Sequence, residues 1–271
     1  MSTRRATSAR PGKQLIAFDR ATGHRFVAGA DEAGRGCLAG PLVAAAVVLD
    51  IDRLIGPDAA LLSRLDDSKK LTREVRELLF SRVTALADSW SVRIMSAAFI
   101  DTYGIQPANL RALHTALAGL RTPVDIAFCD GFDLTLPQRH LAGAQPLAFP
   151  VHQLVKGDRT SAAVAAAAII AKVTRDRLMS DLDVHTQGRW AYHEHHGYAT
   201  SAHHERIQLH GITEHHRRCF ASAAYDGADV VLALPGPSER VAKMLDADER
   251  AVSVLSHDHD IEPVSDYATL Q

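Results

Sequence analysis

The sequence contains little cysteine, few aromatic residues and no long hydrophobic run. Its three cysteines, Cys37, Cys129 and Cys219, are far apart and form no CxxC pair. That pattern argues against a disulfide framework and a cysteine-based zinc site, and it fits a reducing cytoplasm. No stretch approaches the ~20 apolar residues of a membrane span. No apolar segment follows the charged N-terminus, as one would in a secretory signal. We therefore expect a cytoplasmic protein that does not enter a membrane.

Charge is nearly balanced over the 271 residues, at a net −2, but it is unevenly distributed. Residues 1–24 carry a net charge of +4, residues 25–220 of +1, and residues 221–271 of −7. An acidic C-terminal segment therefore conceals a mildly basic central part. This distribution is compatible with phosphate binding without establishing it.

The composition divides the chain into three predicted parts. Residues 1–23 are polar and basic, and we expect a flexible arm there. Residues 24–220 form the predicted globular domain, with a histidine-rich, helical C-terminal part over about 185–220. Residues 221–271 are rich in Pro, Gly, Ser and Asp, which predicts a mostly disordered acidic tail with one short helix at 237–250.

Short apolar runs alternate with helical patterns in the central part. Apolar runs predict five strands, over 24–30, 42–49, 91–98, 124–129 and 147–155. Thr72 followed by Glu74 predicts the start of a helix that runs to about Ala87. Pro107 with leucines at helical spacing predicts another, and residues 160–181 predict a long third helix. Strands followed by alternating helices and strands indicate a mixed sheet of the α/β class.

Four acidic residues stand where predicted strands end. Asp31 and Glu32 lead into a glycine-rich turn, Asp130 precedes Gly131, and Asp158 precedes the long helix. Acids at strand ends can converge on one edge of a sheet, where their repulsion calls for a cation. Oxygen ligands favour Mg²⁺ or Mn²⁺. Two such ions ~4 Å apart can activate water and stabilise the leaving oxygen of a phosphodiester.

Each acid also has an ordinary structural explanation. An Asp before Gly at a strand end commonly forms a turn or caps a helix, although an adjacent pair of acids gains nothing in that role. Asp125 and Asp133 flank Asp130, but one lies inside the predicted strand and the other beyond the turn. Asp176 stands between two arginines, so we expect an ion-paired surface acid there.

Seven segments resemble bacterial ribonuclease HII, in that family's order. They are VAGADEAGRGCLAGP at 27–41, DSKKL at 67–71, DG at 130–131, VKGD at 155–158, AKVTRDR at 171–177, HGYAT at 196–200 and EHHRRCF at 214–220. Together they span roughly residues 24–220. Seven collinear matches are far more specific than one short motif.

The resemblance implies a ribonuclease H-like mixed five-stranded sheet flanked by helices, with a small helical C-terminal part. It implies endonucleolytic cleavage of RNA in RNA–DNA hybrids and cleavage 5′ of ribonucleotides embedded in duplex DNA, leaving a 3′-hydroxyl and a 5′-phosphate. By the same resemblance Asp31, Glu32 and Asp130 bind Mn²⁺ or Mg²⁺, and Asp158 completes the catalytic set. We expect a monomer.

Substrate-binding residues are also implied by the resemblance. Gly34, Arg35 and Gly36 match the loop that reads the ribose 2′-hydroxyl, the group that distinguishes RNA from DNA. Tyr198 matches a tyrosine that packs on the sugar at the cleavage junction, and the alternative is a half-buried structural tyrosine.

Further residues before helix starts could contact phosphate. They are Ser68, Lys69, Lys70, Lys156 and Arg159, for which a solvated surface position is the alternative.

Histidines are concentrated in one segment, with nine of the fifteen between residues 185 and 216. The spacing over 193–196 is too tight for a tetrahedral zinc site on one helix, and there is neither HExxH nor a paired cysteine. We expect hydrogen-bonded or surface histidines instead.

Three other functions remain as alternatives. A ribonuclease HIII-like hybrid nuclease would carry an extra N-terminal domain, for which 24 residues are too few. A non-catalytic nucleic-acid-binding module would lack one of the four acids. A junction nuclease or transposase-like enzyme would need neither the loop at 34–36 nor Tyr198.

Overall fold

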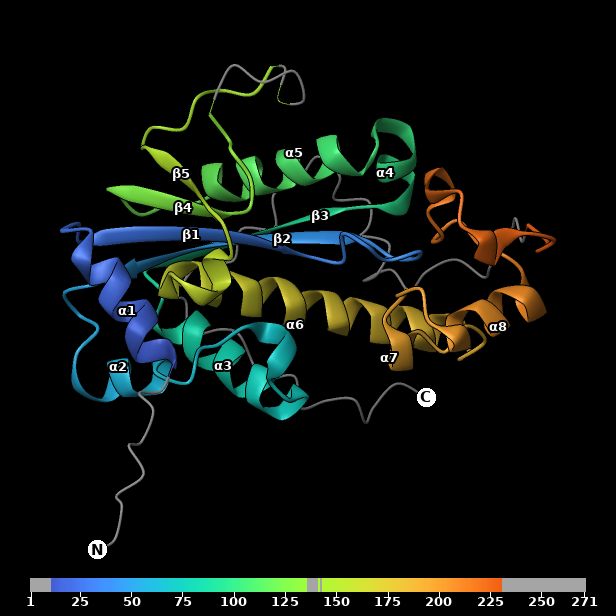
Figure 1. The fold of residues 1–271 in the computed structure, drawn as a ribbon, viewed down its shortest axis with the longest axis horizontal. Coiled ribbons are helices and arrows are strands. Elements are labelled where there is room, and N and C mark those ends of the chain that lie inside the picture. Colours follow the sequence, from blue (N-terminus) through green and yellow to red (C-terminus); the bar gives the residue numbers. More distant parts are fainter. Residues whose placement is uncertain (1–10, 136–140, 142, 231–271) are drawn as a thin grey trace, which may run out of the picture.

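The computed structural model describes residues 11–135, 141 and 143–230, which form a five-stranded sheet with helices on both faces (Figure 1). The strands are β1 (Phe26–Ala33), β2 (Leu42–Asp50), β3 (Ser89–Met95), β4 (Ile126–Asp130) and β5 (Val151–Leu154). Their order is β3-β2-β1-β4-β5. β1 pairs antiparallel with β2, as β2 does with β3, whereas β1 pairs parallel with β4, as β4 does with β5. The predicted mixed sheet is confirmed.

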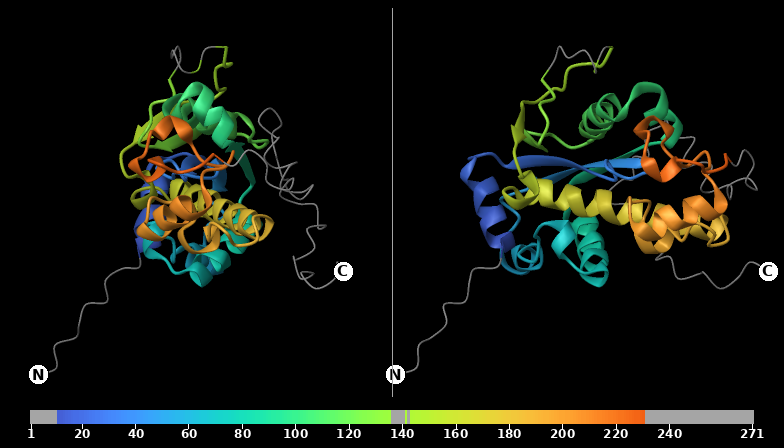
Figure 2. Two further views of the ribbon diagram at one scale, coloured as in Figure 1. Left: turned by 90° about the vertical axis from the view of Figure 1, so that its right-hand side faces the viewer. Right: turned by 45° about the vertical axis from the view of Figure 1, so that its right-hand side comes forward.

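Helices form a layer on each face of the sheet. They are α1 (Pro11–Ala21), α2 (Gly56–Leu62), α3 (Arg73–Leu86), α4 (Ala97–Tyr103), α5 (Ile105–Ala118), α6 (Ala162–His185), α7 (Tyr192–His195) and α8 (Ser201–His210). α4 and α5 lie over one face, and α1, α2, α3 and α6 lie under the other (Figure 1). α7 and α8 extend beyond one end of the sheet, as the small helical C-terminal part (Figure 2). No helix within these described ranges is long and apolar enough to cross a membrane.

The core consists of two apolar layers because strand side chains alternate between the faces of the sheet. Along β2, Val43 and Val47 pack in the layer that contains α6, whereas Ala44 and Val48 pack in the layer that contains α5. α6 approaches β1 so closely that a Cβ on Gly29 would lie 2.2 Å from the backbone of Ala163 and Val164. Only glycine fits at this contact.

Two predicted strands end earlier or begin later than expected. The prediction over 91–98 runs past the end of β3, because Ser96 caps α4 by accepting a hydrogen bond from the Phe99 amide at 3.0 Å. The prediction over 147–155 contains Pro150, and β5 begins directly after it. Proline has no amide hydrogen for a strand ladder, which places it at the strand boundary.

The prediction of a loose arm over residues 1–23 is wrong for its second half, which forms α1. Leu15 and Ile16 are buried in the core. Asp19 is also fully buried, and its Oδ2 accepts a hydrogen bond from the Ala163 amide at 2.9 Å. Asp19 therefore satisfies a free amide in the first turn of α6 and fixes α1 to the fold.

Replacing Asp19 tests this attachment. Asp19→Ala is expected to lower the free energy of unfolding by about 1–2 kcal/mol, because the first turn of α6 loses its acceptor. Asp19→Asn keeps an acceptor oxygen and is expected to cost less. Burial raises the pKa of Asp19 to about 6. The folded protein therefore holds this proton more tightly than the unfolded chain does. The resulting stabilisation is present at low pH and is lost as the pH rises through about 6. Thermal unfolding at about pH 5 and about pH 8 should show the Asn variant gaining on wild type at the higher pH; equal stability of all three proteins would contradict this role.

Residues 221–230, which the sequence assigns to the tail, belong to the fold. The Tyr225 hydroxyl donates to the carbonyl oxygens of Leu38 and Arg217, at 2.9 and 3.3 Å. Residues 1–10 and 231–271, with the predicted helix at 237–250, lie outside the described residues.

Candidate active site

The four predicted acidic residues come from three places in the fold. Asp31 and Glu32 lie near the end of β1, and Asp130 is the last residue of β4. Asp158 lies in the short 3-10 turn Gly157–Arg159 that leads from β5 into α6. Residues up to 127 positions apart in the sequence, from Asp31 to Asp158, are thus placed at one region of the sheet.

The register of the parallel strands places Asp31 beside Asp130. Ala30 lies opposite Cys129, so the next residue of each strand is also adjacent, with the strands about 4.8 Å apart. Because side chains alternate, Asp31 and Asp130 lie on the α6 face, whereas Glu32 lies on the α5 face. The carboxylates therefore approach the end of these strands from both faces.

Hydrogen bonds fix the turn that carries Asp158. Asp130 Oδ1 accepts from the Gly157 amide at 2.6 Å. Lys156, just before it, has a left-handed backbone with φ of 57°. Asp31 Oδ1 accepts from the Glu32 amide, also at 2.6 Å. Asp130 thus positions the next acidic residue as well as contributing its own charge.

The acids interact electrostatically as one group. Burial and then the charges of Glu32 and Asp130 raise the pKa of Asp31 well above its usual range. Burial and Asp130 raise the pKa of Glu32 to about 7. Burial and Asp130 likewise raise the pKa of Asp158. The positive charge of Lys69 lowers the pKa of both Glu32 and Asp158, but by less than these effects raise it. Protein cations offset only part of this repulsion, so the group favours a bound cation.

The donor atoms fit a divalent metal. They are carboxylate oxygens, the ligands that Mg²⁺ and Mn²⁺ prefer. Glu32 Oε2 is buried without a hydrogen-bond partner, as are both amide atoms of Asn109 on α5, which lies close enough to lower the pKa of Glu32. In the part of the chain that is described, no three acidic, histidine or cysteine side chains already converge at metal-ligand geometry. Such sites are commonly completed by water and substrate phosphates.

The acids that flank Asp130 have structural partners instead. Asp125 Oδ2 accepts from the amides of Arg25 and Phe26, at 3.1 and 2.8 Å, which joins the start of β1 to the start of β4. Asp133 Oδ1 accepts from the Thr135 amide at 2.8 Å. This supports the choice of Asp130 among the three.

Two buried arginines hold the loop that follows Asp31 and Glu32. Arg175 donates to the carbonyl oxygens of Pro41 and Ala39, at 2.9 and 3.1 Å. Arg217 donates twice to the carbonyl of Gly40 and once to that of Arg35, at 2.9 to 3.0 Å. Both side chains are fully buried. Their contacts occupy four carbonyls in and after the loop and so restrain its backbone. The sequence did not single out either arginine.

The loop itself exposes Arg35 and Gly36 and buries Gly34. Gly34 has a φ of 89°, and a Cβ there would lie 1.9 Å from Arg175 Nε. The Arg35 guanidinium lies 4.8 Å from the ring centre of Phe132 and donates to Gln106 Oε1 at 3.1 Å. Arg35 is therefore oriented by neighbours, whereas Gly36 has open space beside it.

Tyr198 lies at the surface, with 37% of its area exposed. Lys172 Nζ and the Arg175 guanidinium lie 5.5 and 5.7 Å from its ring centre, within the range of cation–π contacts. Arg175 also donates to the carbonyl of His196 at 2.9 Å. Arg175 thus connects the predicted sugar-reading loop to the segment that carries Tyr198.

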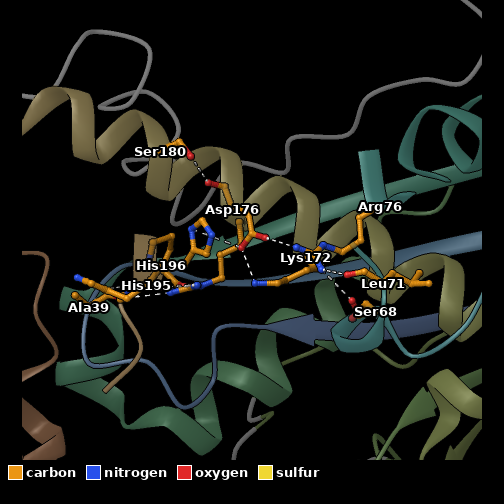
Figure 3. A network of polar contacts seen from close by, with 12 residues as sticks. Ala39, Ser68, Leu71, Arg76, Lys172, Asp176, Ser180, His195 and His196 are labelled. Atoms are coloured by element: carbon orange, nitrogen blue, oxygen red, sulfur yellow. Dashed lines mark hydrogen bonds and ion pairs between the residues drawn. The ribbon is translucent and has the colours of Figure 1, made fainter. Parts of the chain in front are cut away.

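The prediction that Asp176 is a surface acid is wrong, since only 9% of it is exposed. Its carboxylate accepts from Lys172 Nζ at 2.7 Å and pairs with Arg76 at 3.7 Å (Figure 3). Arg76 donates to the carbonyls of Ser68 and Leu71, at 3.2 and 2.6 Å. Asp176 therefore links α6 to a segment with predicted phosphate-binding residues.

The predicted phosphate-binding residues differ in how they are placed relative to the acids. Asp67 accepts from the Lys69 amide at 3.0 Å and is ion-paired with Arg159. Ser68 is buried, whereas Lys69 is exposed, and its charge acts on Glu32 and Asp158. Lys70 is paired with Asp66 at 3.3 Å, and Lys156 is exposed. Lys69 is the best placed of these to meet a phosphate beside the carboxylates.

Comparison with known proteins assigns the family. A family model described as Ribonuclease HII matches residues 28–223. The chain is also 43% identical over 212 residues to Ribonuclease HII of Geobacillus kaustophilus, covering 77% of this chain and 74% of that protein. The chain belongs to the ribonuclease HII family. All four acids, the loop at 34–36 and Tyr198 lie within the residues that the family model matches.

Solved structures give the same fold. The ribonuclease H2 of Pyrococcus horikoshii OT3 is similar with a TM-score of 0.58 and 26% identity, over 83% of this chain and 99% of that chain. Bst-RNase HIII in complex with Mn²⁺ is similar with a TM-score of 0.56, over 92% of this chain and 76% of that chain. At 20% identity the second similarity concerns the fold alone. The predicted ribonuclease H-like fold is confirmed.

Proposed function

We propose that this member of the ribonuclease HII family is an endonuclease that hydrolyses the RNA strand of RNA–DNA hybrids. We propose further that it cuts 5′ of ribonucleotides embedded in duplex DNA, leaving a 3′-hydroxyl and a 5′-phosphate, as a step in removing them. We also propose that the enzyme acts in the cytoplasm as a monomer; its three free cysteines fit a reducing compartment.

One observation carries the proposal. Asp31 and Glu32, adjacent to Asp130, run directly into a loop whose carbonyls are held by two buried arginines. With its carbonyls occupied, the loop can present amides and the Arg35 side chain to a ligand. A cleavage centre and a group able to read a 2′-hydroxyl are therefore rigidly connected.

Asp31, Glu32 and Asp130 would hold Mn²⁺ or Mg²⁺, with Asp158 beside them. Two divalent ions in such a site supply an activated water and neutralise charge on the phosphate and the leaving oxygen. Asp130 orients the turn with Asp158 through the Gly157 amide. Lys69 contributes positive charge for a neighbouring phosphate. Arg35 and the backbone of Gly34 and Gly36 face the ribose.

The alternatives have less support. The family model that matches is Ribonuclease HII, and the ribonuclease HIII neighbour shares the fold at 20% identity. A non-catalytic binding module would not require a buried group of carboxylates with raised pKa values, because such a group costs stability. The presence of all four acids favours an enzyme.

The test uses purified full-length protein and an RNA–DNA hybrid with each strand labelled. With Mn²⁺ or Mg²⁺ we expect RNA fragments that end in a 3′-hydroxyl, an intact DNA strand, and no products in excess chelator. Equal cutting of the two strands, or unchanged cutting in chelator, would reject the proposal.

Metal affinity is expected to depend on pH. Carboxylates bind metal when deprotonated, and the pKa of Glu32 is about 7. Apparent Mn²⁺ affinity should therefore rise as the pH increases through about 7. Titration calorimetry in buffers of different ionisation enthalpy should also detect proton release. Affinity that is flat across this range would contradict the raised pKa.

Replacing Tyr198 tests the sugar contact. Tyr198→Ala should lower kcat/KM by about tenfold or more at an isolated ribonucleotide, because a flat ring beside the junction is lost. Tyr198→Phe keeps the ring and should retain most of the rate. An unchanged rate for Tyr198→Ala would remove Tyr198 from the site.

A further inference from the structure

Three buried histidines lie together in the C-terminal helical part. His195 ends α7, His203 lies on α8, and His216 follows α8. The rings of His195 and His203 are stacked 4.2 Å apart, and those of His203 and His216 are 5.4 Å apart. Within the described ranges no such cluster has metal-binding geometry. These side chains therefore need another explanation.

Their hydrogen bonds determine which nitrogen of each ring carries the proton. His195 Nε2 lies 2.8 Å from the Trp190 carbonyl, so it donates, and His195 Nδ1 accepts from the Gly197 amide at 3.1 Å. His203 has the opposite form, because its Nδ1 lies 3.0 Å from the carbonyl of Tyr198 and must donate. A carbonyl oxygen can only accept.

His216 has the same form as His195. Its Nδ1 accepts from the Thr213 amide at 2.9 Å, so the proton is on Nε2. The Nε2 atoms of His203 and His216 are both buried without a partner. His203 Nε2 is an acceptor and His216 Nε2 is a donor, and the two rings are neighbours.

The cluster is uncharged under ordinary conditions. Burial, and next the proximity of His195, lowers the pKa of His203 to about 4. Burial and His203 lower the pKa of His216 to about 2. Burial also lowers the pKa of His195. Each histidine therefore acts as a neutral group with one donor and one acceptor.

Two of these groups hold the backbone beside Tyr198. His195 accepts from the Gly197 amide, and His203 donates to the Tyr198 carbonyl. His196 and Gly197 both have left-handed backbones, with φ of 47° and 78°. Such a path persists only where surrounding contacts determine it.

We propose that His203 is a positioning residue, which fixes the Tyr198 backbone through its Nδ1–H and so aims the exposed ring at the sugar. The inference rests on the proposed role of Tyr198. It predicts that a donor at the position of Nδ1 is needed, whereas an imidazole is not.

Replacing His203 with asparagine or with glutamine separates these requirements. Both residues carry an amide group, but at different distances from Cβ. The asparagine amide nitrogen is two bonds from Cβ, as Nδ1 of histidine is, whereas that of glutamine is one bond farther. His203→Asn can thus donate to the Tyr198 carbonyl, and His203→Gln cannot from the same rotamer. We expect kcat/KM at an isolated ribonucleotide to fall about tenfold or more for Gln and clearly less for Asn. Thermal unfolding measured alongside shows whether the two variants have similar stability.

Combination with Tyr198→Ala distinguishes positioning from general damage. If His203 acts through Tyr198, His203→Gln should cause no further loss in the Tyr198→Ala protein. An equal loss in both backgrounds, or equal rates for His203→Asn and His203→Gln, would overturn the inference.

A second measurement needs neither substrate nor variants. NMR of the full chain with ¹⁵N-labelled histidine should show His203 protonated at Nδ1, and His195 and His216 at Nε2. A His203 protonated at Nε2, or charged at neutral pH, would overturn the inference directly. If wild-type protein cuts no ribonucleotide, the proposed function fails, while this spectrum still tests the hydrogen bond.

Discussion

Asp130→Asn is expected to lower cleavage by about 1,000-fold or more, because it removes one negative charge from the proposed metal site. The amide oxygen can still accept from the Gly157 amide, so the turn with Asp158 should remain in place. Removing one charge from a mutually repelling group should leave the melting temperature in chelator unchanged or raise it. Steady-state cleavage and thermal unfolding measure the two effects.

Asp133→Asn is the matched control. Asp133 lies three residues away and accepts from the Thr135 amide, which an asparagine oxygen can also do. Its cleavage rate should stay close to wild type. Near-normal turnover by Asp130→Asn, or an equal loss in both variants, would remove Asp130 from the site.

Gly34→Ala is expected to cause the second large effect. Its Cβ would lie 1.9 Å from the buried Arg175 Nε, at a backbone φ of 89°. Arg175 would have to move from the carbonyls of Pro41, Ala39 and His196. We expect a loss of about 2–4 kcal/mol in the free energy of unfolding, with a large loss of cleavage. Denaturant unfolding and kcat/KM measure these effects.

Gly36→Ala separates folding from sugar recognition. Nothing lies within 4 Å of a Cβ at this position. The variant should therefore unfold like wild type, yet cut more slowly if the ribose approaches this backbone. Wild-type stability for Gly34→Ala would contradict the packing argument. Wild-type cleavage by Gly36→Ala would remove Gly36 from the sugar contact.

The strand ends and the acids on them were predictable because their signals are local. Asp31 and Glu32 follow an apolar run, and Asp130 ends another. Parallel strands that end together bring such residues together. Thr72 likewise caps α3, accepting from the Val75 amide at 3.4 Å.

Contacts between distant elements were not predictable in the same way. Asp176 has arginines on either side in the sequence, yet its partners are Lys172 on its own helix and Arg76 on α3. Arg175 points to backbone carbonyls instead of an acid. The sequence alone does not indicate which carbonyls a fold leaves unpaired, so buried arginines of this kind are read as surface charge.

Asn109 and helix α1 were not predicted either, although the sequence contains a signal for each. Asn109 precedes leucines at helical spacing, on the face that α5 buries, and a polar residue on an apolar face often has a specific role. The helical pattern within residues 11–21 was obscured by the basic residues before it. Histidine spacing argued against a zinc site on one helix, but it did not predict the three-ring cluster, which depends on the fold of α7 and α8.

Cleavage at a ribonucleotide is tested most directly with a DNA duplex that contains one ribonucleotide and, as its control, the same duplex with a deoxyribonucleotide at that position. We predict a single nick 5′ of the ribonucleotide, a 3′-hydroxyl at the nick, no nick in the control, and loss of the nick in chelator. A nick on the 3′ side, or equal cutting of both duplexes, would contradict the account.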